Sequence, residues 1–129
     1  MNHTLVIWAI IVFVENRIRT KIQYAALADA VGFSLSHLRT VFMNHTGKSL
    51  VQYITERKMS WAAFDIIHSS DNIFTIAERY GFSNPDTFTR AFKRVVGLNP
   101  SAFRKIRPPL KHVKLCAGVF GFAVQKYVI

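Results

Sequence analysis

Two stretches of the sequence carry hydrogen-bonding side chains three and four residues apart, a spacing that places them on one face of a helix. The groups are hydroxyls, guanidiniums and one carboxylate, at Ser36, Arg39, Thr40, Asp86, Thr89 and Arg90. Such groups can hydrogen-bond to the edges of bases in a DNA groove and to backbone phosphates. A solvated helix face would show the same periodicity, so for either stretch alone both interpretations stay open.

The two stretches belong to two copies of one sequence motif, VGFSLSHLRTVF at 31–42 and YGFSNPDTFTRAF at 80–92. Glycine, phenylalanine and serine align at the start of each copy, and after one extra residue in the second copy two apolar positions and a glycine align again. In each copy the glycine reverses the chain, the aromatic residue fills the crevice between helices, and a Ser or Asn begins the second helix. This pattern predicts a duplicated helix-turn-helix, and the occurrence of two basic copies favours a recognition surface over a solvated face.

Apolar residues at helical spacing predict a chain that is helical almost throughout. The expected helices cover residues 5–19, 23–31, 34–45, 48–69, 73–80, 84–96 and 99–103. Ser34 and Asn99 are the expected N-caps, and Gly32, Gly47 and Gly97 are expected to end helices. We therefore predict an all-α fold of about seven helices. The two helix-turn-helix units would lie at 5–47 and 73–104, with the long helix at 48–69 between them, in one domain spanning 1–104.

The composition favours a polyanionic partner. Seventeen Lys and Arg against seven Asp and Glu give a formal net charge of +10, which points first to nucleic acid and second to an anionic membrane surface. The apolar run at 5–14 is shorter than the roughly 20 residues of a membrane span and lacks the features of an export signal. A single cysteine, Cys116, excludes an intrachain disulfide and fits a reducing compartment. We expect no membrane partner and a cytoplasmic location.

Other chemistry is scarce in the sequence. The five histidines show no metal-ligand spacing: His3, His37, His45, His68 and His112. The carboxylates are scattered, and we expect the following to be ordinary solvated or capping groups: Glu15, Asp29, Glu56, Asp65 and Glu78. Trp8 and Trp61 occupy apolar helical positions and are expected to pack in the core. The sequence therefore predicts no enzyme activity, no cofactor and no metal site.

Two segments carry a family resemblance: AERYGFSNPDTFTRAFKRVVGLNPSAFR at 77–104 and GKSLVQYITERKM at 47–59. They resemble the AraC/XylS family of bacterial transcription regulators, and in particular its stand-alone DNA-binding branch. The resemblance, which spans about residues 5–104, implies recognition helices at about 34–45 and 84–96 in successive major-groove segments on one face of double-stranded DNA. Half-sites would then lie about one helical turn apart. The resemblance also implies that residues 1–104 form a DNA-binding domain with 48–69 as its linker helix. It further implies contact with RNA polymerase at the bacterial nucleoid, and we expect an activator that binds DNA as a monomer.

The resemblance assigns site residues by position. Base contacts fall on Ser36, Arg39, Thr40, Pro85, Asp86, Thr89 and Arg90. Phosphate contacts are expected at His37, Lys48, Thr87, Lys93 and Arg94. Relatives in this branch have an aromatic residue and then Gln and Arg at the three first-helix positions, and two glutamines at Pro85 and Asp86, so the family's usual target sequence does not carry over. Arg39 is expected to be the strongest base reader.

Two rival functions remain open at this stage: a non-specific nucleic-acid or nucleoid binder, and an interaction module inert toward DNA. The tail, residues 105–129, is not explained by the simple family pattern. Its β-branched and aromatic residues with glycines between them predict one or two strands. We expect the start of a truncated effector domain, with an apolar segment packed on the helical domain as the alternative.

Overall fold

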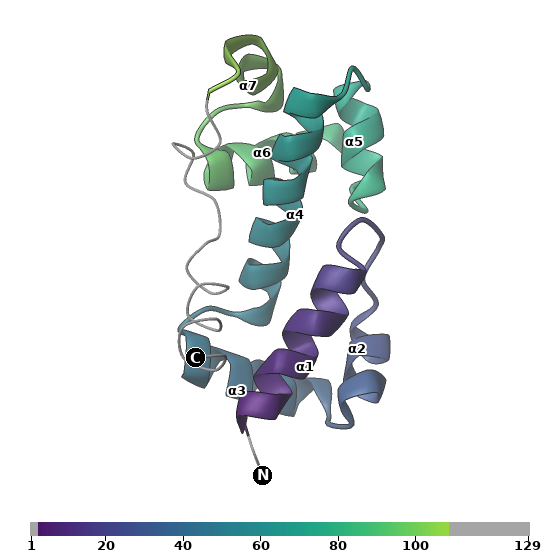
Figure 1. Cartoon of the computed structure of the whole chain (residues 1–129), viewed down its shortest axis with the longest axis vertical. Coiled ribbons are helices and arrows are strands. Elements are labelled where there is room, and N and C mark those ends of the chain that lie inside the picture. The colour runs from purple at the N-terminus through teal and green to yellow at the C-terminus, as the bar shows by residue number, and fades with distance from the viewer. Residues whose placement is uncertain (1–2, 109–129) are drawn as a thin grey trace.

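The computed structural model describes residues 3–108, and within that range every regular element is a helix. The helices are α1 (His3–Asn16), α2 (Tyr24–Val31), α3 (Leu35–Thr46), α4 (Leu50–His68), α5 (Ile73–Arg79), α6 (Pro85–Val96) and α7 (Pro100–Ile106). In Figure 1 the long α4 runs along the molecule, with α1–α3 gathered at one end and α5–α7 at the other. The predicted all-α fold, with two helix-turn-helix units joined by a linker helix, is confirmed.

Local capping interactions set where the helices start and stop. The Ser34 hydroxyl accepts a hydrogen bond from the His37 N–H at 3.1 Å, and Asn99 Oδ1 accepts one from the Ala102 N–H at 2.8 Å. The side chains of Ser49, Asn72 and Asn84 cap α4, α5 and α6 in the same way. Gly47 and Gly97 end the two recognition helices at positive φ, where a side chain would be strained.

Each end of the molecule has its own apolar core, and α4 contributes to both. Leu50, Tyr53 and Ile54 pack into the core formed with α1, α2 and α3. Met59, Ala62, Ala63 and Ile66 pack into the core formed with α5, α6 and α7. Trp61 packs partly buried against both cores, as Trp8 does against the first, which agrees with the core positions predicted for them. Because α4 is buried in both cores, neither subdomain can separate from the linker helix without losing apolar contacts.

Two helix ends differ from the prediction by three residues, and the other ends agree within one or two. The first helix was expected to reach residue 19, but α1 ends at Asn16 and the chain turns, with Ile18 and Ile22 buried beneath it. The last helix is longer than the predicted turn and continues to Ile106, so the predicted domain boundary after residue 104 falls inside α7. The strands predicted for the tail fall at residues outside the described range.

Candidate nucleic-acid interface

The α3 helix presents the predicted recognition face to solvent. Leu38, Val41 and Phe42 are buried on its inner side, whereas Ser36, Arg39 and Thr40 are exposed. The Thr40 hydroxyl donates to the Ser36 carbonyl oxygen at 3.1 Å, so its oxygen remains free to accept. The Arg39 guanidinium lies 5.8 Å from the centre of the Tyr24 ring and forms no ion pair with any residue in the described range. Its charge is therefore available to a ligand.

The α6 helix presents a second, more basic face. Phe88 and Phe92 are buried against the second core, and on the outer side Thr89 is half-buried. Six further outer side chains are exposed: Pro85, Asp86, Thr87, Arg90, Lys93 and Arg94. None of the three cations among them pairs with a carboxylate in the part of the chain that the structure describes. Because Pro85 is the first residue of α6 and offers no side-chain donor, the hydrogen-bonding groups of this outer face lie at later positions.

Two of the predicted phosphate contacts are not free in this structure. Lys48 Nζ pairs with a Glu56 carboxylate oxygen, which neutralises its charge. The His37 ring lies 5.2 Å from the Phe33 ring, and its Nε2 is buried without a hydrogen-bond partner. The structure therefore leaves Thr87, Lys93 and Arg94 as the accessible members of the predicted phosphate set.

The prediction that the carboxylates are solvated or capping groups is wrong for three of them. Besides Glu56, Glu15 accepts two hydrogen bonds from the Arg57 guanidinium, both at 2.8 Å, and one from the Tyr53 hydroxyl at 3.1 Å. Asp65 is only 6% exposed and is the acceptor for a cluster of cationic and hydroxyl donors. Asp29 and Glu78 are exposed as predicted.

The burial of Asp65 had a signal in the sequence. The neighbouring positions 62, 63 and 66 form the apolar face of α4, and an acidic residue in that stripe must find partners or lose stability. The sequence could not identify those partners, because Arg19, Arg79 and Tyr80 lie 46, 14 and 15 residues away.

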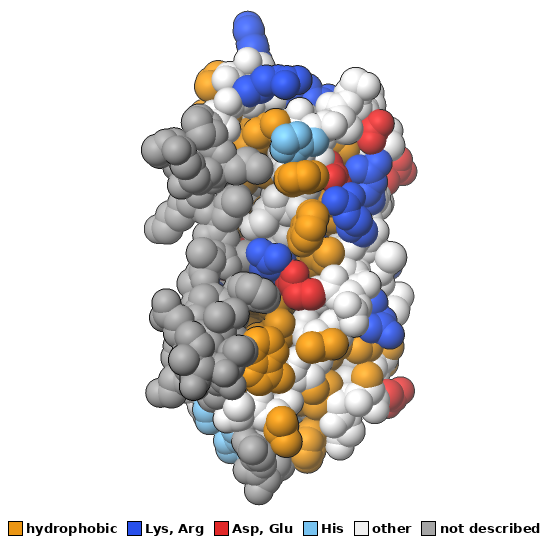
Figure 2. Space-filling model, viewed as in Figure 1, with side chains coloured by type: hydrophobic (Ala, Val, Ile, Leu, Met, Phe, Trp, Pro, Cys, Tyr) orange, Lys and Arg blue, Asp and Glu red, His pale blue; other side chains and the backbone are white. Residues whose placement is uncertain are grey.

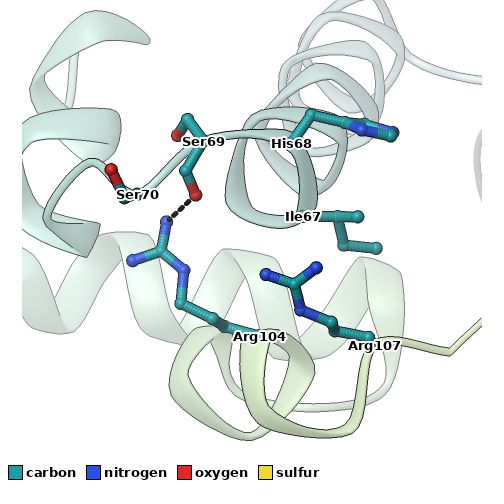
Figure 3. A pocket seen from close by; sticks show the side chains of 6 residues that line it. All are labelled: Ile67, His68, Ser69, Ser70, Arg104 and Arg107. Atoms are coloured by element: carbon teal, nitrogen blue, oxygen red, sulfur yellow. Dashed lines mark hydrogen bonds between the residues drawn. The ribbon is translucent and has the colours of Figure 1, made fainter.

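An open hollow of about 600 Å³ lies between the end of α4 and the end of α7 (Figure 3). Its lining residues are Ile67, His68, Ser69, Ser70, Arg104 and Arg107. Arg104 is already engaged there, because its Nε donates to the Ile66 carbonyl at 3.1 Å and its Nη2 to the Ser69 carbonyl at 3.2 Å. These bonds satisfy carbonyls at the C-terminal end of α4 and attach α7 to it. Arg104 therefore acts in this hollow as a cap of α4 and is not free to bind a ligand.

No cluster of His, Cys, Asp and Glu in the described residues could hold a metal ion. Within the same residues, none of the helices has the length and apolar character needed to cross a membrane. On the face shown in Figure 2, most Lys and Arg side chains lie over the upper half, towards α5–α7, and apolar side chains are more prominent over the lower half. The basic character is thus uneven along this face.

Comparison with known proteins agrees with the helix-turn-helix arrangement of this chain. A family described as a helix-turn-helix domain matches residues 27–106. The chain is 34% identical to the multiple antibiotic resistance protein MarA of Escherichia coli K12, over 78% of this chain and 79% of that protein. It is 29% identical to the right origin-binding protein of Escherichia coli K12, over 99% of this chain but only 45% of that protein.

Solved structures share the fold. A DNA-binding transcriptional dual regulator from Escherichia coli K-12 superimposes with a TM-score of 0.69 at 21% identity, over 78% of this chain and 96% of that one. The C-terminal domain of AraT, a response regulator from Geobacillus stearothermophilus, gives a TM-score of 0.70 at 24% identity, over 81% of this chain and 87% of that one.

Proposed function

The chain belongs to the AraC/XylS-type family of helix-turn-helix proteins and is a sequence-specific DNA-binding transcription regulator. From this premise we propose that it binds DNA as a monomer, with α3 and α6 in successive major-groove segments. The observation that carries the proposal is the pair of exposed recognition faces, with Arg39 on α3 and Arg90 and Arg94 on α6, none of them neutralised by a carboxylate in the described residues. Such unpaired guanidiniums and hydroxyls are the groups that contact base edges and phosphates.

The dimensions of the linker helix support binding of both helices to one duplex. The 19 residues of α4, at about 1.5 Å per residue, make a rod of roughly 28 Å. Half-sites on one face of B-DNA lie about 34–36 Å apart, which is one helical turn. Because a single chain supplies two recognition helices joined by a rod of comparable length, it needs no second copy to occupy two half-sites.

We assign base contacts to the outer face of each recognition helix. On α3 these are Ser36, Arg39 and Thr40, and on α6 they are Pro85, Asp86, Thr89 and Arg90. Phosphate contacts are assigned to Thr87, Lys93 and Arg94, and the ion-paired Lys48 and the shielded His37 are not among the free contacts.

The proposal includes activation of transcription through contact with RNA polymerase, at the nucleoid in the cytoplasm. Its support is the family relationship, since the relatives are transcription regulators and not enzymes. For the same reason we propose that the chain is not an enzyme and needs no cofactor.

A selection of bound fragments from random duplex DNA tests the proposed function directly. The expected result is a motif of two short elements whose centres lie about one helical turn apart. A non-specific binder would enrich no motif, and its affinity would fall with salt alike on every sequence. An interaction module without DNA affinity would shift no duplex even at low salt. Either of these last two results would contradict the proposal.

A further inference from the structure

One cluster of polar contacts connects the turn after α1, in the first subdomain, to α4 and α5 at the second core. Arg19, in the turn after α1, donates from Nη1 to Asp65 Oδ2 on α4 at 3.0 Å. The same oxygen accepts a hydrogen bond from Arg79 Nη1 at 3.1 Å and one from the Tyr80 hydroxyl at 2.5 Å. Arg79 ends α5 and Tyr80 is its C-cap, so the cluster connects the first subdomain to the second through a single carboxylate.

The cluster is well compensated electrostatically. A buried carboxylate is costly unless it is paired and hydrogen-bonded, and Asp65 has two guanidiniums and one hydroxyl as partners. Arg79 also donates to Asp71 Oδ2 at 2.9 Å, and its bonds to Asp71 and Asp65 raise its pKa. Burial and the bond to Asp65 raise the pKa of Tyr80, which keeps its hydroxyl protonated as a donor. The Arg19 guanidinium also lies 5.0 Å from the centre of the Trp61 ring, which orients it further.

The position of the cluster relates it to the second recognition helix. Tyr80 is followed directly by Gly81, in the turn that leads to α6. The chain around Lys21 packs against that turn, because a Cβ atom built on Gly81 would lie 3.8 Å from the Lys21 Cα. Figure 1 shows the loop between α1 and α2 reaching the end of α5 where this turn lies. The loop therefore contacts the segment that leads into α6.

We infer that Arg19, Asp65, Arg79 and Tyr80 form a clamp that fixes α3 and α6 relative to each other and makes the protein selective for half-site spacing. The inference rests on the proposed two-half-site binding. A single helix holds two bodies at one separation but permits bending and twisting about its axis. The loop after α1 opposes both motions, because Arg19 bonds to the far half of α4 and the chain at Lys21 packs on the turn after α5. These residues act by positioning and touch no base.

Spacing selectivity follows from the geometry of DNA. One base pair added between half-sites moves them apart by about 3.4 Å and rotates one against the other by roughly 35°. A clamped protein cannot follow that rotation without breaking the Arg19–Asp65 hydrogen bond, whereas an unclamped protein can follow it by bending or twisting at α4. Loss of the clamp should therefore flatten the dependence of affinity on spacing.

The test compares Arg19→Ala with Arg17→Ala. Both variants remove one positive charge from the same turn, but Arg17 lies over the Phe13 ring and has no part in the cluster. Arg19 is 43% exposed and leaves Asp65 paired with Arg79 when it is removed, so the fold should survive, as thermal unfolding monitored by circular dichroism would verify. Dissociation constants are measured on the selected target and on targets with one or two base pairs inserted or deleted between half-sites.

The full-length wild type and Arg17→Ala should lose about tenfold or more in affinity on a one-base-pair change, comparable to the loss of a base contact. Arg19→Ala should bind the best target more weakly but lose less than about threefold across the same series, and Arg19→Lys should restore part of the selectivity. Asp65→Asn, tested on the same DNA set, should flatten the profile as well. If folded Arg19→Ala shows the same dependence of affinity on half-site spacing as the wild type, the inferred clamp is wrong. Absence of any two-element target for the wild type would instead refute the proposed function.

Discussion

Arg39 and Lys93 are both exposed cations, but they differ in chemistry and in position. Arg39 projects from the outer face of α3, with a planar guanidinium that can donate two parallel hydrogen bonds to guanine. Lys93 lies in the last turn of α6, and its ammonium acts as a point charge toward phosphate. The same loss of one charge should thus affect recognition in two different ways.

Arg39→Ala is expected to reduce discrimination between bases, and Lys93→Ala to reduce affinity evenly on all sequences. The loss of a bidentate base contact corresponds to about 1–3 kcal/mol at one position of the target. The loss of one phosphate contact should lower the slope of log affinity against log salt by about 1. Binding is titrated against the matched duplex and its single-base variants over a salt series. If Arg39→Ala leaves the ranking of sequences unchanged, its assignment as a base reader is wrong.

At the scale of an element, α6 is held by aromatic packing on its inner side. Phe92 is fully buried, and its ring centre lies 5.8 Å from that of Phe88 and 5.5 Å from that of Phe103 on α7. The polar and basic residues of the helix lie on the outer side, so its orientation depends on these contacts more than on the caps at its ends.

Phe92→Ala is expected to lower the free energy of unfolding of the second subdomain by about 3–5 kcal/mol, because a large side chain is removed from a packed core and leaves a cavity. Urea unfolding followed by circular dichroism measures the change. Phe74→Ala is the matched control, since Phe74 is on α5 in the same subdomain but is 40% exposed. A loss no larger than that of the control would show that α6 is not anchored by this ring.

At the scale of the whole molecule, positive charge is greater in one half, and side chains suited to hydrogen-bonding with bases are more evident in the other. Residues 1–70 carry seven Lys and Arg against four Asp and Glu, a net charge of +3, and residues 71–129 carry ten against three, a net charge of +7. The more basic half begins its recognition helix with Pro85 and Asp86, which are poor general readers of bases. The less basic half presents Arg39 and Thr40.

We therefore expect α3 to specify sequence and α6 mainly to hold phosphates. One half-site of the target should be strongly constrained in sequence and the other weakly constrained. Footprinting combined with substitution of each base pair across the site measures this constraint. A DNA-cleaving reagent attached to the protein near α3 shows which half-site lies beneath α3. Equal constraint at both half-sites, or stronger constraint beneath α6, would contradict the expected division.

The sequence by itself determined the helices, their caps and the duplicated helix-turn-helix. Ser34 bonds to the backbone three residues ahead, and Gly47 and Gly97 accept a backbone conformation that other residues avoid. These interactions are complete within one or two helical turns. The inward and outward faces of α3 and α6 followed from the same short-range periodicity, so most of the proposed contact residues could be named in advance.

Only the tertiary structure decided which polar groups are free to bind. Lys48 and His37 have residue types suited to phosphate, but Lys48 pairs with Glu56 on α4 and the Nε2 atom of His37 is buried. Asp65 lies in an apolar stripe whose partners come from two other elements, up to 46 residues away in sequence. Periodicity cannot report such contacts, because a pair distant in sequence is joined only when both cores have formed around α4 and set the direction of every side chain between them.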